Sequence, residues 1–269
     1  CMKHLLTIAG SDSSGGAGIQ ADLKTFSAHG TYGMSVMTAI TAQNTTGVTA
    51  VVDLNPSIIA AQIDAVFSDI RVDAVKIGML SQPQTIACVA ERLRFWQPSI
   101  IVLDPVMISK SGYALLKPEA CAALIAELLP LATLVTPNLP EAETLTGCKI
   151  ASQEDMQRAA QAILAMGAQA VLLKGGHLAD SADDFLLTRD GSCWFEGVRV
   201  ESQHTHGTGC TLSSSLAANL ANGMTLAAAV AASKAYVTQG IRHGLAIGKG
   251  CGPTHHFYEL YQKAGLPDE

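Results

Sequence analysis

A short turn in the last quarter of the chain combines residue types that bind anions and move protons. Gly207-Thr208-Gly209-Cys210 opens a run rich in alanine, serine and leucine, which predicts a buried helix over residues 209–221. The first N–H groups of a helix have no acceptor within it and carry the positive end of its dipole, and the glycines let an anion come close to them. This predicts an anion site. Cys210 lies in the same field, which predicts a lowered thiol pKa and a role as proton acceptor or nucleophile. The alternative is a small apolar side chain that packs at the start of the helix.

Further along the predicted sheet, polar residues follow apolar runs. Four of them come shortly after such a run: Asp104, Asn138, Glu141 and Lys174. Two acids, an amide and a lysine at one rim suit a magnesium ion and a polyphosphate. Asp104 and Glu141 would hold the metal, directly or through its waters, and Lys174 would neutralise the phosphate in transfer. For each residue alone, a solvated side chain at a strand end is the alternative. Their joint placement with the 207–210 turn favours a site.

The elements that must position these residues alternate along the chain. Apolar and β-branched runs predict strands at residues 3–9, 35–43, 48–54, 74–77, 100–103, 131–135, 170–173, 185–187 and 193–200. Helical spacing predicts helices at residues 19–29, 56–67, 83–95, 118–129, 140–145, 152–166, 209–221, 225–243 and 253–264. Strands 35–43 and 48–54 are predicted to pair as a hairpin, as are the last two strands. Ser152 has the type expected of an N-cap.

This alternation predicts a single α/β domain over residues 1–269. The central sheet is expected to be mostly parallel and covered by helices on both faces, with a small hairpin extension. No linker, low-complexity tract or internal repeat divides the sequence. Ligands of such sheets bind beyond the carboxyl ends of the strands, which is where the polar residues above are expected to gather.

Composition narrows the range of partners. The formal net charge is −6 and aromatic residues make up 5% of the chain, with no basic stripe, so we expect no nucleic-acid partner. No apolar run reaches the length of a membrane span, so we expect no membrane partner either. Seven scattered cysteines without a Cys-x-x-Cys pair fit a reducing cytoplasm better than a disulfide framework or a zinc site. A small-molecule ligand in a cytoplasmic protein is the expectation.

Signatures of several enzyme classes are missing from the sequence. There is no Gly-x-x-x-x-Gly-Lys-[Ser/Thr] loop, no Gly-x-Ser-x-Gly elbow and no His-Glu-x-x-His, and the glycines of residues 10–18 do not match the dinucleotide fingerprint in register. The neighbouring His255 and His256 would point apart, which favours packing over metal binding. His204 and His206 are interpreted as structural or adjacent to a nucleotide.

Seven motifs, in order and in register, carry a resemblance that covers nearly the whole chain. They are Ala9-Gly10-Ser11-Asp12-Ser13-Ser14-Gly15-Gly16-Ala17-Gly18-Ile19-Gln20-Ala21-Asp22-Leu23-Lys24-Thr25, Ala42-Gln43-Asn44, Lys76-Ile77-Gly78-Met79-Leu80, Leu103-Asp104-Pro105-Val106-Met107, Thr136-Pro137-Asn138-Leu139-Pro140-Glu141-Ala142, Lys174-Gly175-Gly176-His177 and His206-Gly207-Thr208-Gly209-Cys210-Thr211-Leu212-Ser213. The sequence resembles the hydroxymethylpyrimidine kinase/phosphomethylpyrimidine kinase family of thiamine biosynthesis. That family belongs to the ribokinase-like superfamily, so the resemblance implies a ribokinase-like three-layer fold.

The resemblance implies two successive phosphorylations with ATP and Mg²⁺. The first converts 4-amino-5-hydroxymethyl-2-methylpyrimidine to its monophosphate, and the second makes the diphosphate. Carried over by position, substrate contacts are implied at Gln43, Gly10, Asp22, Met79 and Val106. A catalytic group is implied at Cys210, Lys174, Gly207, Thr208 and Gly209, and nucleotide contacts at Asn138, Lys174, Thr208 and Lys234. The Gln43 amide offers a donor beside an acceptor, which matches an aminopyrimidine edge. A polar residue of an edge strand is the alternative for Gln43, and plain core packing is the alternative for Met79 and Val106.

Cys210 occupies a position where the wider superfamily usually has an aspartate base. A thiolate could take the proton of a primary hydroxyl if the turn keeps it ionised, whereas the second acceptor is already a phosphate and needs no base. Three other functions stay open: a pyridoxal/pyridoxine kinase of the same fold, a non-catalytic pyrimidine-binding sensor, and a cysteine-dependent acyl transferase with His206 as partner of Cys210. The resemblance also implies a homodimer, for which the apolar hairpin at residues 35–54 is the candidate contact.

Overall fold

Eight strands form one central sheet in the computed structural model, which describes residues 1–176, 178 and 181–267. They are β1 (His4–Ala9), β2 (Tyr32–Met37), β5 (Ala74–Ile77), β6 (Ile101–Leu103), β7 (Leu134–Val135), β8 (Ala170–Leu173), β9 (Asp184–Thr188) and β10 (Gly191–Phe195). Their spatial order is β10-β9-β8-β7-β6-β5-β1-β2, and every pair from β8 to β2 is parallel. β9 and β10 extend the sheet as an antiparallel hairpin. The expectation of a mostly parallel sheet is confirmed.

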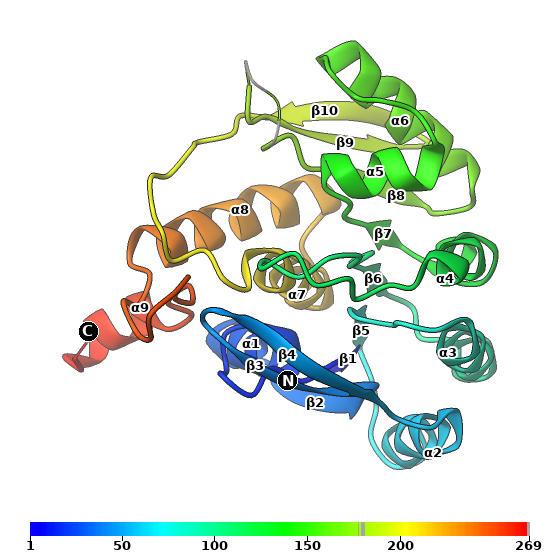
Figure 1. Ribbon diagram of the computed structural model, residues 1–269, viewed down its shortest axis with the longest axis horizontal. Helices are drawn as coiled ribbons and strands as arrows, with labels where there is room; N and C mark the ends of the chain where they lie inside the picture. Colours follow the sequence, from blue (N-terminus) through cyan, green and yellow to red (C-terminus); the bar gives the residue numbers. More distant parts are fainter. Residues whose placement is uncertain (177, 179–180, 268–269) are drawn as a thin grey trace.

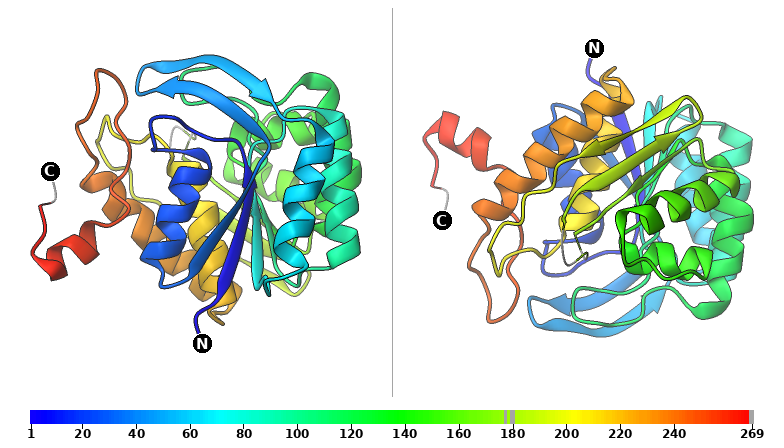
Figure 2. Two further views of the ribbon diagram at one scale, coloured as in Figure 1. Left: turned by 90° about the horizontal axis from the view of Figure 1, so that it is seen from below. Right: turned by 90° about the horizontal axis from the view of Figure 1, so that it is seen from above.

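Helices cover both faces of the sheet (Figures 1 and 2). One face carries α2 (Pro56–Phe67), α3 (Pro83–Trp96), α4 (Pro118–Ala123), α5 (Leu139–Thr146) and α6 (Gln153–Ala165). The opposite face carries α1 (Gly18–Ala28), α7 (Thr208–Ala221) and α8 (Leu226–Arg242), and α9 (Tyr258–Ala264) lies beside this layer near the C-terminus. No helix of the described residues is long and apolar enough to cross a bilayer.

Alternating residues of the strands build a separate core on each face. In β5, Val75 and Ile77 join the core beneath α2 to α6, whereas Ala74 joins the core beneath α7 and α8. Full burial of an aliphatic side chain stabilises the fold by roughly 1.5–3 kcal/mol, so these strands hold the sheet rim in place. The same alternation turns Lys76 toward the α1 and α7 layer, where a lysine needs a charged partner.

The hairpin extension consists of β3 (Ala39–Asn44) and β4 (Gly47–Asp53), which pair with each other apart from the main sheet. The sequence predicted one strand over residues 35–43, but the structure divides it at Thr38, so its first half is part of β2. Thr38 donates its N–H to the Ala9 carbonyl and its hydroxyl to the Met79 carbonyl, and both bonds fix it at the rim of the sheet. The chain leaves the main sheet at Thr38, and no glycine or proline at this position indicates in the sequence that the strand ends there.

Several further elements are shorter than predicted, and the strand expected at residues 131–135 is reduced to β7 (Leu134–Val135). The predicted helix over residues 118–129 is α4 followed by a π-helical turn (Leu124–Leu128) and a 3₁₀ turn (Leu129–Leu131), where Pro130 lacks the N–H that an α-helix needs. The predicted helix over residues 253–264 is α9 alone, because Pro253 pairs with His206 in an isolated bridge. The predicted strand 193–200 ends at Phe195. The Ser152 cap of α6 is confirmed, since its hydroxyl accepts the Asp155 N–H.

Candidate active site

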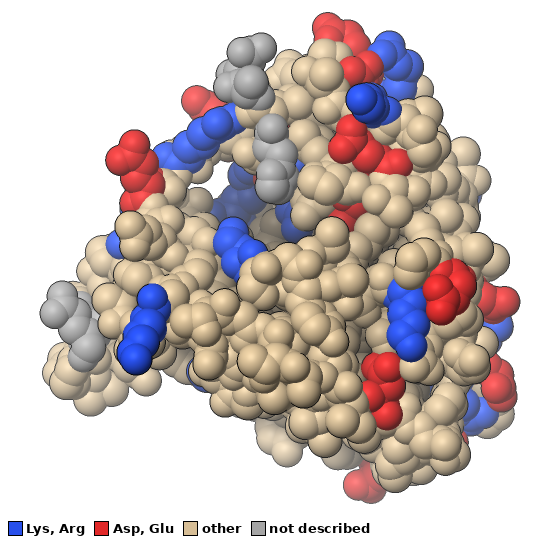
Figure 3. Space-filling model, in the orientation of Figure 1, with Lys and Arg blue, Asp and Glu red and all other residues tan. Residues whose placement is uncertain are grey.

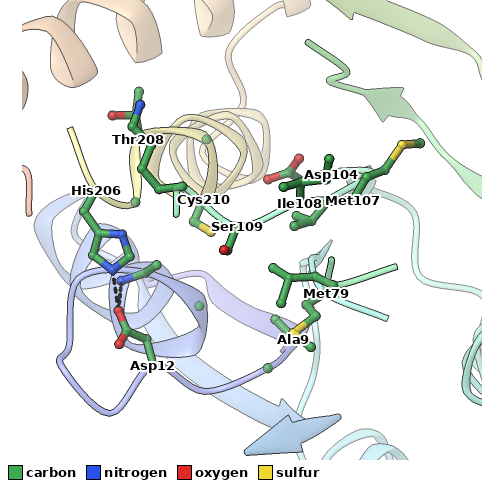
Figure 4. A pocket seen from close by; sticks show the side chains of 18 of the residues that line it. Ala9, Asp12, Met79, Asp104, Met107, Ile108, Ser109, His206, Thr208 and Cys210 are labelled. Carbon is green, nitrogen blue, oxygen red and sulfur yellow. Dashed lines mark hydrogen bonds and ion pairs between the residues drawn. The ribbon is translucent and has the colours of Figure 1, made fainter. Parts of the chain in front are cut away.

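A cavity of about 640 Å³ opens at the carboxyl ends of the parallel strands. Most residues singled out from the sequence line it, and they are Gly10, Gln43, Met79, Asp104, Val106, Asn138, Glu141, Lys174, Gly207, Thr208, Gly209 and Cys210. Asp22 and Lys234 are not in the lining. The molecular face of Figure 3 is hollowed beside α8, and basic side chains lie at the walls of this hollow. Figure 4 shows Cys210 and Met79 facing each other across the cavity.

The 207–210 turn has the geometry of an anion site. Gly207 is the N-cap of α7 with φ +82°, and a Cβ there would lie 1.8 Å from the Gly16 carbonyl oxygen, so only glycine fits. Thr208 donates its hydroxyl to the Thr205 carbonyl over 2.6 Å, which holds the turn closed. Among the described residues, no acceptor takes the backbone N–H groups of Gly209 or Cys210, so two donors at the positive end of α7 face the cavity.

The Lys174 ammonium and the Asp104 carboxylate both lie close to Gly209 in this turn. A Cβ built on Gly209 would lie 3.7 Å from both the Lys174 ammonium nitrogen and an Asp104 carboxylate oxygen. Lys174 follows β8 and donates its backbone N–H to the Pro137 carbonyl, which places it beside Asn138. The sequence prediction that strand ends gather these residues at one rim is therefore confirmed.

Asp104 and Glu141 are buried acids in the cavity lining, 3% and 8% exposed. Glu141 is fixed by a capping box at the start of α5, in which it accepts the Asn138 N–H while the Asn138 side chain accepts the Glu141 N–H. Burial, then the Asp104 charge, raise the pKa of Glu141 to about 7 against the opposing effect of Lys174. Two carboxylates that repel each other beside an anion site fit Mg²⁺, which takes one or two protein carboxylates together with waters and substrate phosphates.

Cys210 points its sulfur into the cavity (Figure 4). The expectation that the helix start lowers its thiol pKa is wrong. Burial, with the charges of Asp22 and Asp104, raises the pKa of Cys210 to about 11, although the Lys76 ammonium and a hydrogen bond from the Gly18 backbone act in the opposite direction. Loss of hydration therefore outweighs the helix dipole at this position.

Asp22 lies beneath the cavity instead of in its wall, which corrects the expected substrate contact. It is fully buried and accepts hydrogen bonds from Lys76 (3.0 Å), Thr7 (2.6 Å) and Ser214 (2.5 Å). These donors come from β5, β1 and α7, so one carboxylate joins α1 to three other elements. Although burial acts in the other direction, the Asp22 charge raises the pKa of Lys76. Lys76 therefore carries a charge, and this charge lies below Cys210.

The wall opposite α7 suits a flat polar ring. A Cβ on Gly10 would lie 2.8 Å from the Met79 sulfur, so the glycine leaves room for the methionine to face the cavity. Gln43 is fixed through its backbone, because its N–H donates to the Ser13 hydroxyl and its carbonyl accepts from the same hydroxyl. Its side-chain oxygen accepts the Thr41 hydroxyl. The Gln43 amide group is thus held at the cavity edge, with Val106 also in the lining.

Lys234 was expected on the nucleotide side but pairs with Asp184 over 2.5 Å outside the cavity lining. Lys234 is placed there by tertiary packing, because α8 lies against the β9 end of the sheet. This brings Lys234 to the Asp184 carboxylate, which also accepts the Gly175 N–H. His177 of the Lys174 motif lies outside the described residues.

Asp12, Lys76 and Lys110 line the cavity without a role assigned from the sequence, and His206, which was interpreted as structural or adjacent to a nucleotide, lines it as well. His206 donates its Nε2–H to Asp12 at 2.7 Å and points away from Cys210 (Figure 4). It is therefore occupied and does not form the dyad that an acyl transferase would need. The sequence did contain a signal for these residues, because all but Lys110 belong to the motifs that carry the family resemblance.

The cavity brings together the groups that a small-molecule kinase needs. They are unpaired amides at a helix start, a lysine, two buried acids and a half-buried thiol. A family model described as phosphomethylpyrimidine kinase matches residues 12–255. The hydroxymethylpyrimidine/phosphomethylpyrimidine kinase of Rhizobium meliloti is 56% identical over 261 residues, which are 96% of this chain and 98% of that protein. The chain therefore belongs to the phosphomethylpyrimidine kinase family.

Solved structures agree with this assignment. The phosphomethylpyrimidine kinase of Clostridium difficile 630 is 56% identical, with a TM-score of 0.80 over 88% of this chain and 98% of that chain. The pyridoxal kinase of Bacillus subtilis, solved as an ADP complex, is 40% identical, with a TM-score of 0.88 over 96% of this chain and 98% of that chain. The fold is ribokinase-like, as the resemblance implied.

Proposed function

We propose that this chain phosphorylates 4-amino-5-hydroxymethyl-2-methylpyrimidine and then its monophosphate, with ATP, in thiamine biosynthesis. The observation that carries the proposal is one cavity that places the Gly209 and Cys210 amides, Lys174 and Asp104 opposite the Gln43 and Met79 wall. The family assignment supports the same reaction.

In the first step the pyrimidine alcohol attacks the γ-phosphorus of ATP. A new O–P bond forms, the bond to the β–γ bridging oxygen breaks, and ADP leaves. The Gly209 and Cys210 amides and Lys174 stabilise the charge on the transferring group, because they already point at the place where it develops. The hydroxyl proton passes to the Cys210 thiolate, which must be ionised to accept it.

In the second step the acceptor is the phosphate of the monophosphate. Its oxygen attacks the γ-phosphorus of a second ATP without losing a proton to the protein, the bond to the β–γ bridging oxygen breaks, and ADP leaves. The amides and Lys174 act as before, whereas Cys210 has no proton to take. One site can therefore make both products if its anion-binding groups serve both steps.

Asp104 and Glu141 would hold Mg²⁺, directly or through waters. The ion would supply charge neutralisation for the phosphates of ATP. Asn138, beside Lys174, and Thr208 are assigned to the nucleotide, and Val106 and Gly10 to the pyrimidine.

The test is ATP consumption by the purified chain with Mg²⁺ and each acceptor offered alone. Turnover of hydroxymethylpyrimidine and of its monophosphate, with the mass of the diphosphate recorded, is the expected result. Binding of the pyrimidine without turnover would instead identify a sensor.

Pyridoxal kinase is the second candidate, since the pyridoxal kinase of Bacillus subtilis matches nearly the whole chain. A pyridine alcohol differs from the pyrimidine mainly at the ring edge that Gln43 would read. Phosphorylation of pyridoxal or pyridoxine with no turnover of either pyrimidine would establish this alternative.

A cytoplasmic homodimer completes the proposal. Ile40 and Val52 are cross-strand neighbours on β3 and β4 and are 50% and 62% exposed, an apolar pair on an extended hairpin. Val52→Lys should therefore halve the mass measured by light scattering, while Met224→Lys, at an exposed residue in the turn between α7 and α8, should not. A monomeric wild-type chain would contradict this assignment.

A further inference from the structure

A buried hydrogen bond between an imidazole and a carboxylate joins two segments that are far apart in the sequence, at the edge of the cavity. His206 Nε2 lies 2.7 Å from Asp12 Oδ2, although 194 positions separate the two residues. Asp12 is 1% exposed and His206 is 6% exposed. Figure 4 shows the pair beside the 207–210 turn, with the imidazole directed at Asp12. The phosphoryl transfer described above assigns neither residue a task.

Asp12 organises the loop that precedes α1. Its carboxylate accepts the backbone N–H groups of Ser14 (2.8 Å), Gly16 (3.1 Å) and Ala17 (2.8 Å) in addition to His206. Burial opposes ionisation, but the hydrogen bonds from His206 and Ser14 outweigh it and lower the pKa of Asp12 to about 2. The carboxylate is therefore an ionised acceptor with four backbone or imidazole partners.

His206 is the residue directly before the N-cap of α7. Its backbone N–H donates to the Gly252 carbonyl, and its carbonyl accepts from Thr254, so three segments meet at this residue. The 12–17 loop and the 207–210 turn pack directly against each other. A Cβ on Gly207 would meet the Gly16 carbonyl oxygen at 1.8 Å, and a Cβ on Gly16 would meet the His206 ring at 2.6 Å.

We propose that Asp12 and His206 are a positioning pair that fixes the 207–210 turn against the 12–17 loop, and thereby the anion-binding amides of Gly209 and Cys210. Neither side chain acts on the acceptor hydroxyl, and the pair serves the phosphoryl group common to both steps. Displacement of the amides by about 1 Å is enough to lower the rate about 100-fold. The pair should therefore affect kcat in both steps and leave the KM of the pyrimidine nearly unchanged.

The test compares His206→Leu, His206→Gln and Asp12→Ala in both steps. His206→Leu should lower kcat about 10- to 100-fold in each step. His206→Gln should recover most of the loss, because its amide can donate to Asp12 from the place of Nε2. The double variant His206→Leu with Asp12→Ala should lose no more than Asp12→Ala alone, since two residues that act as a unit are not additive.

His29→Gln is the matched control. Its imidazole also makes a hydrogen bond between distant segments, 2.7 Å to Ser215, but lies outside the cavity lining. This variant is expected to change the melting temperature and not kcat. The proposal is overturned if His206→Leu stays within about twofold of the wild type, if its loss is confined to the first step, or if His206→Gln is no better and activity only follows melting temperature.

The positioning role rests on one part of the proposed function, namely that the chain transfers a phosphoryl group, and not on which acceptor it uses. The wild type is therefore assayed first with both pyrimidines and with pyridoxal. Turnover of pyridoxal only would refute the substrate assignment, and the same variants compared on pyridoxal would still support or overturn the positioning pair.

Discussion

Cys210→Ala separates the two chemical steps. The first acceptor is a hydroxyl that must lose a proton, and general base catalysis contributes about 100-fold or more to such a step. The second acceptor is an ionised phosphate. We expect kcat to fall about 100-fold in the first step, equivalent to about 2.7 kcal/mol, and by less than about threefold in the second.

The pH dependence follows from the position of the thiol. Because the pKa of Cys210 is raised to about 11, roughly one thiol in a thousand is ionised at pH 8. The ionised fraction rises about tenfold per pH unit below the pKa, so first-step kcat of the wild type should rise steeply from pH 7 to pH 9. Cys210→Ala should lack this slope, and the second step should lack it in both proteins.

The assay is ADP formation with each pyrimidine as sole acceptor, across that pH range, with product masses recorded. Cys121→Ala is the control, since Cys121 is also half-buried with a pKa raised by burial but lies in α4 beyond the cavity lining. Equal losses in the two steps would refute the base assignment and leave Cys210 a packing residue of the anion site.

Three other perturbations probe the metal site, the buried pair and the loop. Asp104→Asn should raise the Mg²⁺ concentration for half-maximal rate about tenfold or more in both steps, measured by metal titration. Lys76→Met should lower stability by about 3–5 kcal/mol and the melting temperature by about 10 °C, because it removes the cationic partner of the buried Asp22 carboxyl; adding Asp22→Asn should restore most of this loss. Asp12→Asn should cost about 2 kcal/mol at pH 7 in chemical denaturation, from a folded pKa of about 2 against 3.8.

The sign of the Asp12 effect is set by its lowered pKa. The carboxylate stabilises the fold above pH 4, and this contribution disappears as the pH falls toward 2, so the wild type and Asp12→Asn should converge there. A constant difference across that range would contradict the assignment. For the metal site, an unchanged Mg²⁺ titration would exclude Asp104 as a ligand. For the buried pair, a double variant no more stable than Lys76→Met would mean that Asp22 is not the source of the loss.

Local pattern was enough to predict most of the sheet. Residues 170–173 are apolar throughout, and residues 74–77 are apolar except for the buried Lys76, as is typical of strands covered on both faces, and both strands were placed as found. The boundaries that failed were set by distant partners. Thr38 ends β2 because Ala9 and Met79 bind it, and Pro253 leaves the predicted helix because it pairs with His206.

In the site, too, some residues could be predicted from local sequence and others depended on distant partners. The carboxyl ends of parallel strands meet at one rim whatever the details, so Asp104, Glu141 and Lys174 could be expected together. Asp22 and Lys234 could not be placed from their neighbours in sequence, since Lys76 and Asp184 determine where they point. The thiol pKa of Cys210 depends on how much water the folded chain excludes, and no spacing of residues encodes that quantity.

The position of α7 has a consequence for how the chain acquires its structure during synthesis. This helix covers the middle of the sheet on one face and contacts β1, β5 and β6. Until residues 208–242 emerge from the ribosome, only α1 lies on this face of the sheet, so Val102 and Leu134 lack the cover of α7 and α8, and Asp22, the partner of Lys76, lacks the hydroxyl of Ser214. A nascent chain that stops short of α7 exposes an apolar sheet and is prone to aggregation. The folding of α7 therefore completes the anion site and covers the apolar face of the sheet at the same time.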